Sequence, residues 1–281
     1  MKKIIIPTDF SETATNAIFY ALELLKYDKS EITIVHAYAD EVYENTKAMS
    51  RDYFEEYKDI VEVNVNRRLQ EVIAEMLKQS PNPRHTYNRI SSFGSLVDVI
   101  DDFVDKENAD LVIMGTKGNT DNTDIMFGSN AIKVIKYVKC PVLAIPVNYH
   151  DMHPKNILFP TDYMVPFKRR ALKLVSSLAK SYVSKVSFLY VSNQKNLSHR
   201  QEDNRTFIED CFIDNKVDYI QLSETDVTKT INKTIETNSI DLLVMVNHRH
   251  SYFEDVLFNS TIEKIGLNIK IPFLVLQNIS R

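Results

Sequence analysis

Residues 3–10 read KIIIPTDF, and residues 156–163, which lie 153 positions later, read NILFPTDY. Each stretch is a short apolar run followed by Pro-Thr-Asp, which is typical of a buried strand that ends in a polar loop. A second pair has the same order, because residues 109–114 (ADLVIM) recur 131 positions later as residues 240–245 (IDLLVM). These paired stretches indicate a tandem repeat of one unit, with 22 fewer residues between the two stretches in the second copy.

Strand and helix patterns alternate through the first copy. Ser11 is the expected N-cap of the first helix, because its hydroxyl can accept a hydrogen bond from a first-turn N–H group. Apolar strands that alternate with helices predict an α/β fold, namely an open parallel sheet of five strands with helices on both faces, in each copy. The expected strands are 3–6, 31–37, 86–91, 111–114 and 142–145, and the expected helices are 12–25, 96–105 and 129–138, with one long amphipathic helix within 41–79.

Length and composition set the broad class. A chain of 281 residues, 44% of them hydrophobic, predicts two domains, which we place at residues 1–147 and 154–281. A net charge of −4 disfavours nucleic acid as a main partner. The first apolar run is too short for a signal sequence and no stretch approaches a membrane span, so we expect a cytoplasmic protein without a membrane partner. The two cysteines, Cys140 and Cys211, are interpreted as reduced core thiols.

Three of the five glycines fall in one short segment, in which residues 115–130 read GTKGNTDNTDIMFGSN. The segment lies between an apolar strand and a helical pattern. Glycine permits a tight turn or a close approach of the backbone to a ligand, and a helix start attracts anions through its N–H groups and its dipole. The spacing is neither that of a P-loop nor that of a dinucleotide fingerprint.

The spacing Gly-x-x-Gly, nine residues, Gly-Ser after the fourth strand resembles the nucleotide motif of the universal stress protein family, and the resemblance extends over the whole chain. It implies a Rossmann-like nucleotide-binding α/β fold and an adenine nucleotide in the first copy. ATP is the expected ligand, with ADP or AMP as alternatives and Mg²⁺ beside a triphosphate. It also implies an internal pseudo-dimer through the last strands, 142–145 and 273–276, and leaves open whether two chains associate as a homodimer.

The implied contacts come from three loops. Asp9, in the loop that also holds Pro7 and Thr8, would lie beside the adenine, and the main chain of His36 and Ala37 would contact the base. The ribose and phosphates would be held by the glycine segment, with the contacts given by Gly115, Lys117, Gly118, Gly128, Ser129 and Asn130.

Each of these residues also has an ordinary structural interpretation. Glycine can serve a strained loop, Asp9 can end a turn, Ser129 can be a helix N-cap and Lys117 can be solvated. Because the topology brings all three loops together, the combination favours a binding site.

The second copy departs from the motif. Val246, Arg249 and Asn259 stand where the first copy has glycine, although Ser260 and Asp162 are retained. We therefore expect a pseudo-site there. The pair His248 and His250 is weak evidence for a metal, because zinc needs three or four ligands, so no metal site is predicted; another anion or a metal in the second copy is left open.

No catalytic motif is present: the sequence has no G-x-S-x-G, no H-E-x-x-H and no P-loop lysine. The sequence therefore favours a regulatory protein of stress response over an enzyme. The alternatives are an interaction module with a vestigial site and a slow ATPase. The substitution Gly118→Arg, which copies position 249, is predicted to abolish nucleotide binding if the chain is a regulatory nucleotide-binding protein. It is predicted to change nothing if the chain is an interaction module.

Overall fold

The computed structural model describes residues 1–117, 127–147, 149–194, 196–247 and 270–278. Its contacts divide the chain into two units, Met1–Asn148 and Tyr149–Arg281. Each unit is described by itself.

The described part of the first unit contains a five-stranded sheet whose neighbouring strands all run parallel. Its strand order is β3-β2-β1-β4-β5. The centre of the sheet is apolar, with Ile6, Val112 and Ile113 fully buried. The strands are β1 (Lys2–Pro7), β2 (Ser30–Ala37), β3 (His85–Ser92), β4 (Leu111–Gly115) and β5 (Val142–Ile145).

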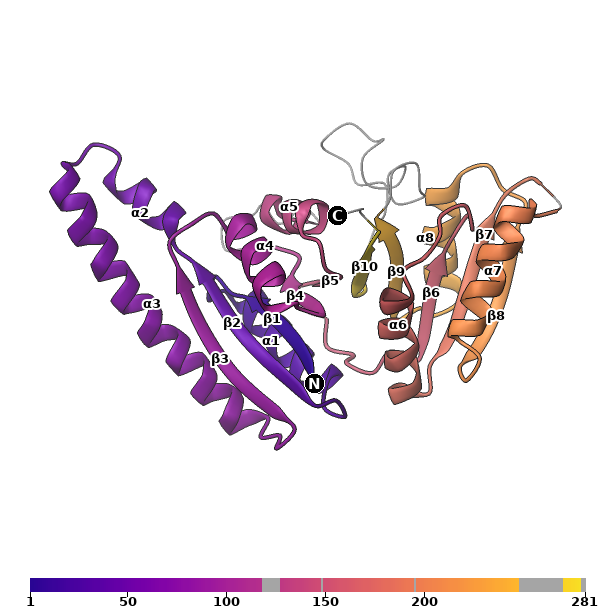
Figure 1. Cartoon of the computed structure of the whole chain (residues 1–281), viewed down its shortest axis with the longest axis horizontal. Helices are drawn as coiled ribbons and strands as arrows, with labels where there is room; N and C mark the ends of the chain where they lie inside the picture. Colours follow the sequence, from indigo (N-terminus) through magenta and orange to yellow (C-terminus); the bar gives the residue numbers. More distant parts are fainter. Residues whose placement is uncertain (118–126, 148, 195, 248–269, 279–281) are drawn as a thin grey trace. The chain divides into compact units, whose positions relative to one another are not determined.

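Helices cover both faces of this sheet. In Figure 1, α4 (Leu96–Glu107) and α5 (Ser129–Tyr137) lie in front of the strands, and α1 (Glu12–Leu24) lies behind them. The Ser11 hydroxyl accepts a hydrogen bond from the Ala14 N–H at 3.1 Å, so the expected N-cap of α1 is confirmed. The α/β class and the open parallel sheet are confirmed as well.

The segment after β2 forms two helices, so the expectation of one long helix within residues 41–79 is wrong. α2 (Ala39–Thr46) ends before α3 (Arg51–Gln79), which runs for 29 residues. The second helix starts after Ser50, whose hydroxyl accepts a hydrogen bond from the Tyr53 N–H at 3.3 Å and so caps α3. The expected amphipathic character is present in α3, where Val61, Val65, Leu69 and Met76 are buried.

The second unit repeats the scheme. Its described strands have the order β10-β9-β6-β7-β8, which corresponds to β5-β4-β1-β2-β3 of the first unit, and its neighbouring strands are also parallel. The strands are β6 (Asn156–Pro160), β7 (Lys185–Val191), β8 (Lys216–Leu222), β9 (Leu242–Asn247) and β10 (Phe273–Gln277). The described helices are α6 (Arg169–Tyr182), α7 (His199–Cys211) and α8 (Val227–Thr237).

The strand registers relate the two units residue by residue. Ile4 of β1 pairs with Leu111 of β4, and Ile157 of β6 pairs with Leu242 of β9. Ile157 lies 153 positions after Ile4, and Leu242 lies 131 positions after Leu111, so the two pairs are related by the offsets of the sequence repeat. Positions in the two units can therefore be compared directly.

Candidate functional site

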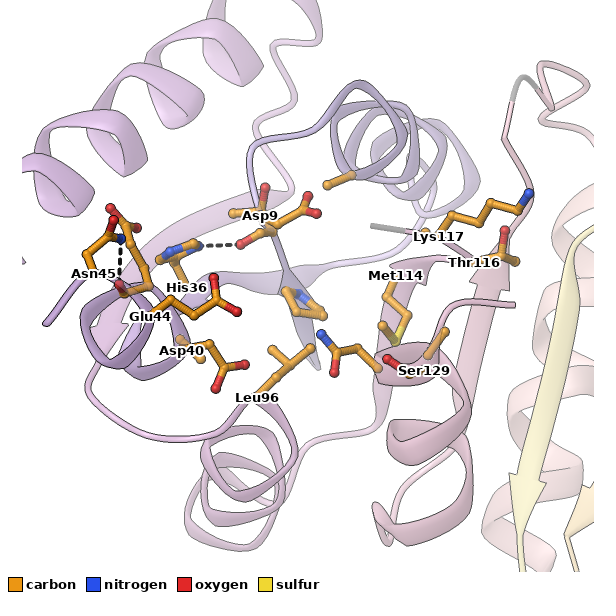
Figure 2. Close-up of a pocket in the computed structure, with 18 residues that line it drawn as sticks. Asp9, His36, Asp40, Glu44, Asn45, Leu96, Met114, Thr116, Lys117 and Ser129 are labelled. Carbon is orange, nitrogen blue, oxygen red and sulfur yellow. Dashed lines mark hydrogen bonds between the residues drawn. The ribbon is translucent and has the colours of Figure 1, made fainter. Parts of the chain in front are cut away.

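A cavity of about 340 Å³ opens in the first unit where the strand order reverses. From β1 the chain proceeds to β2 on one side, and from β4 it proceeds to β5 on the other. In open parallel sheets such a reversal leaves a crevice beyond the carboxyl ends of the strands. The cavity is bordered by the ends of β1, β2 and β4 and by the start of α5 (Figure 2).

Most of the residues proposed from the sequence line this one cavity. Gly128 is not among the lining residues, and Gly118 lies outside the described residues. Those that line it are Pro7, Thr8, Asp9, His36, Ala37, Gly115, Lys117, Ser129 and Asn130. Residues more than 100 positions apart in the sequence are thus brought to one place by the topology.

The loop after β1 is held by its own polar side chains. The Thr8 hydroxyl oxygen accepts a hydrogen bond from the Phe10 N–H, and the Asp9 carboxylate accepts one from the Ser11 N–H, each at 3.0 Å. Phe10 has a φ of 61°, a left-handed backbone that is uncommon for an aromatic residue. Asp9 therefore serves the turn and also lines the cavity.

His36, near the end of β2, packs against this loop. Its Nδ1 lies 2.6 Å from the Thr8 carbonyl oxygen, and because a carbonyl can only accept, Nδ1 carries the hydrogen. Burial lowers the pKa of His36; the hydrogen bond to Thr8 and the charges of Glu41 and Asp9 oppose this shift, and the charge of Arg68 adds to it. The imidazole is thus held neutral, with Nε2 left as an acceptor.

The start of α5 lies beside the end of β4. The Gly128 N–H donates to the Thr116 carbonyl at 2.7 Å, and the Thr116 N–H donates to the Ile145 carbonyl at 2.9 Å. Gly128 is the N-cap of α5, so the interpretation of Ser129 as an N-cap is wrong; Ser129 is the first residue inside the helix.

The cap distinguishes α5 from its neighbours. The helices α1, α3 and α4 each begin with a serine whose hydroxyl accepts a first-turn N–H, whereas the cap of α5 is a glycine, which has no side chain. α2 also has no side-chain cap, but its first turn carries Asp40 and Glu41, which disfavour an anion there. The first N–H groups of a helix have no partner within it. In α5 these groups belong to Ser129, Asn130 and Ala131, which line the cavity. The side of the cavity at the start of α5 can therefore receive an anion.

Gly115 serves packing. A Cβ atom at this position would lie 2.7 Å from Thr13 Cγ2, closer than real Cβ contacts allow, and 3.2 Å from the Thr13 carbonyl oxygen, which is tighter than most such contacts. None of the described glycines has a positive φ. The Cβ side of Gly115 therefore faces α1, and Gly115 also lines the cavity.

The first turns of α2 give the cavity an acidic side, which sequence reasoning missed. Asp40, Glu41 and Glu44 line it, and Figure 2 shows Asp40 and Glu44 near His36, while Thr116, Lys117 and Ser129 lie on the opposite side. A helix that starts two residues after β2 must pass this edge of the sheet, so the acidic run was the available signal.

The corresponding loop of the second unit keeps the same backbone. The Tyr163 N–H donates to the Thr161 hydroxyl oxygen at 3.0 Å, and the Met164 N–H donates to the Asp162 carboxylate at 2.9 Å. Tyr163 has a φ of 57°, close to that of Phe10. The repeated Pro-Thr-Asp thus specifies one turn in both units.

The surroundings of this turn differ in the second unit. The strand registers place Tyr190 where the first unit has His36 and Val246 where it has Gly115. Gln201 of α7 is buried and donates to the Asp162 carbonyl at 2.8 Å and to the Tyr190 hydroxyl at 3.3 Å. Asn204 donates to the Tyr163 carbonyl at 2.7 Å. The remaining positions of the expected pseudo-site, Arg249, Asn259 and Ser260, lie outside the described residues, as do His248 and His250.

The described ranges also bear on metal binding and on membrane crossing. No group of three or more His, Cys, Asp or Glu side chains there is arranged to hold a metal ion. In the same ranges no helix combines the length and the apolar character needed to cross a membrane.

The fold and the cavity define a tandem α/β protein with a ligand-sized crevice at the strand-order reversal of its first unit. The model of the universal stress protein family matches residues 1–146 and again residues 153–277. The chain therefore belongs to the universal stress protein family.

Individual relatives agree with this assignment. The universal stress protein MJ0531 of Methanocaldococcus jannaschii is 28% identical over 144 residues, which cover 51% of this chain and 81% of that protein. MJ0577 of the same organism is 26% identical over 157 residues, which cover 51% of this chain and 94% of that protein. A crystal structure of a universal stress protein from Archaeoglobus fulgidus matches 99% of this chain and 98% of its own, with a TM-score of 0.65 and 20% identity, and so has a similar fold.

Proposed function

We propose that the cavity of the first unit binds an adenine nucleotide and that the chain is a regulatory protein of stress response. The observation that carries the proposal is the convergence of three loops, after β1, β2 and β4, on one cavity beside a helix start with a glycine cap. A cavity of about 340 Å³ lies within the size range of small-molecule sites.

The charges around the cavity favour one orientation of the ligand. The phosphates would lie at the start of α5, near Ser129, Asn130 and the backbone of Gly115 and Lys117. The base would lie at the opposite end, beside Asp9 and His36, because the carboxylates of α2 repel phosphate. ATP is the proposed ligand, with ADP or AMP as alternatives, and Mg²⁺ would accompany a triphosphate.

We propose that the chain binds its nucleotide, and slow ATP hydrolysis is the one enzymatic alternative. We propose that the second unit is a pseudo-site, because α7 hydrogen-bonds to the loop that would face a ligand. Pairing of the two last strands, association of two chains and a cytoplasmic location remain predictions from the sequence.

Thermal unfolding with ATP, ADP and AMP, each with and without Mg²⁺, tests the proposal, and calorimetry then gives the dissociation constant. A ligand at about 100 times its dissociation constant adds roughly 2.7 kcal/mol, which raises the melting temperature by several degrees. No shift with any nucleotide would contradict binding and favour the interaction module. Phosphate release that depends on Asp9 and Mg²⁺ would instead favour the slow ATPase.

A matched pair of variants locates the site. Asp9→Ala and Asp162→Ala each remove a carboxylate that accepts the N–H of the residue two positions later, so both lose the same turn contact. We expect only Asp9→Ala to weaken nucleotide binding. Equal loss in both variants would show that the effect is structural or that the site is elsewhere.

A further inference from the structure

The left-handed loop of the first unit is enclosed by two side chains from distant elements. The Phe10 ring lies 4.7 Å from the His36 ring, centroid to centroid. On α3, the Arg68 guanidinium carbon lies 3.9 Å from the centre of the Phe10 ring. His36, Phe10 and Arg68 thus form a contact chain from β2 through the loop to the long helix.

This contact chain bears on the cavity through Asp9. Phe10 follows Asp9 directly, and its left-handed φ of 61° fixes the direction in which the loop leaves β1. A backbone in this sparsely populated region persists only when the surrounding structure determines it. The Thr8 hydrogen bond holds the Phe10 N–H, and the contacts with His36 and Arg68 hold its ring.

The second unit holds the equivalent loop in another way. The rings of Tyr163 and Tyr190 lie 5.7 Å apart, as the counterpart of Phe10 and His36. The helix after the second strand then binds the loop backbone, since Asn204 of α7 donates to the Tyr163 carbonyl. In the first unit Arg68 of α3 contacts the aromatic ring of the loop, and the loop also borders an open cavity.

We propose that Arg68 is a positioning residue for the nucleotide site, acting on Asp9 through Phe10; the inference rests on the proposed function of that site. Arg68 contributes a flat cation stacked on an aromatic ring, an arrangement that arginine makes better than lysine. The long helix of the first unit is therefore part of the support of the binding site, in addition to covering β3.

The test compares Arg68→Met with Arg67→Met in the full chain, with ATP as the probe in calorimetry. Arg67 is the preceding residue, is exposed as Arg68 is, and pairs with Glu71 across one helical turn, so it is a matched control for the loss of a charge on α3. Because Arg68 is itself exposed, we expect Arg68→Met to raise the dissociation constant by about three- to fivefold, within the range of a cation–π contact at an exposed site. Arg67→Met should change the dissociation constant less than about twofold. Arg68→Lys should change the logarithm of the dissociation constant by about half as much as Arg68→Met does.

A double-mutant cycle with Asp9→Ala separates positioning from a general structural effect. If Arg68 acts through Asp9, adding Arg68→Met to Asp9→Ala should cause little further loss of affinity. Additive losses would overturn the inference, as would an unchanged affinity in Arg68→Met while the wild type binds. Wild-type protein that binds no nucleotide would overturn the proposed function and this inference with it.

Discussion

Thr13 of α1 fills the space beside Gly115 at the end of β4: a Cβ atom on Gly115 would lie 2.7 Å from the Thr13 methyl carbon. The contact fixes how closely the first helix approaches the central strands. In the second unit, Val246 takes the place of Gly115. There α6 begins at Arg169, four residues later than α1 by the repeat offset, so the close contact is not needed.

The first prediction concerns stability. Gly115→Ala should lower the free energy of unfolding by about 1–3 kcal/mol, because the backbone oxygen of Thr13, 3.2 Å away, cannot move as a side chain would. Gly94→Ala is the control, since its new Cβ would meet only the end of the Val99 side chain, at 2.9 Å. Urea denaturation measures both. Equal losses would show that the Thr13 contact carries no special cost.

The second prediction concerns the protonation of His36. Burial lowers the pKa of this imidazole below the ordinary value of 6.5. Stability from the neutral form is therefore fully present above pH 6.5 and is lost as the pH falls through the lower pKa of the folded state. Titration of the His36 ring resonances by NMR should give a midpoint below 6.5. A midpoint at or above 6.5 would contradict the description of a desolvated, neutral ring.

The charge of Arg68 gives the same experiment an internal check. Arg68 is one of the causes that lower the pKa of His36. Arg68→Met should therefore raise the midpoint of the His36 titration, while Arg67→Met should leave it nearly unchanged. An equal midpoint in all three proteins would show that solvent screens the guanidinium from the imidazole.

The third prediction concerns α7. Gln201→Ala should destabilise the protein by about 1–3 kcal/mol, because it removes the donor to the Asp162 carbonyl and the acceptor for the Ser198 N–H at the helix start. Arg200→Ala, at the exposed neighbouring position, is the control and should cost less than about 0.5 kcal/mol. Nucleotide affinity should be the same in both variants. A change of affinity in Gln201→Ala would argue against a pseudo-site in the second unit.

The fold followed from the sequence because its signals are local and repeated. The apolar runs before Pro-Thr-Asp and the two offsets located corresponding strands, and the register of Ile4 with Leu111 and of Ile157 with Leu242 agrees with them. The break between α2 and α3 does not show in the apolar pattern, because the buried positions of α3 begin only at Val61, well after the break. Ser50, followed by Asp52 in the first turn of α3, was the available signal for a new helix start.

The cavity was predicted less completely, for a physical reason. Strand ends can be read from the sequence, so Asp9, His36 and Ser129 were placed together correctly. The part played by Gly115 depends on how closely α1 packs, and the acidic side depends on where α2 starts. Both are tertiary relationships that no spacing within one segment reveals.

The hydrogen bonds from α7 have a consequence for how the two halves respond to their surroundings. Gln201 and Asn204 belong to the same chain as the loop that they bind, so the strength of their hydrogen bonds does not depend on the concentration of any solute. A nucleotide bound in the cavity beside Asp9 would come from solution, and its contribution would grow with the logarithm of its concentration. We therefore expect one half of constant stability and one half whose stability reports the level of a metabolite, and hydrogen exchange measured at increasing nucleotide concentration would resolve them separately.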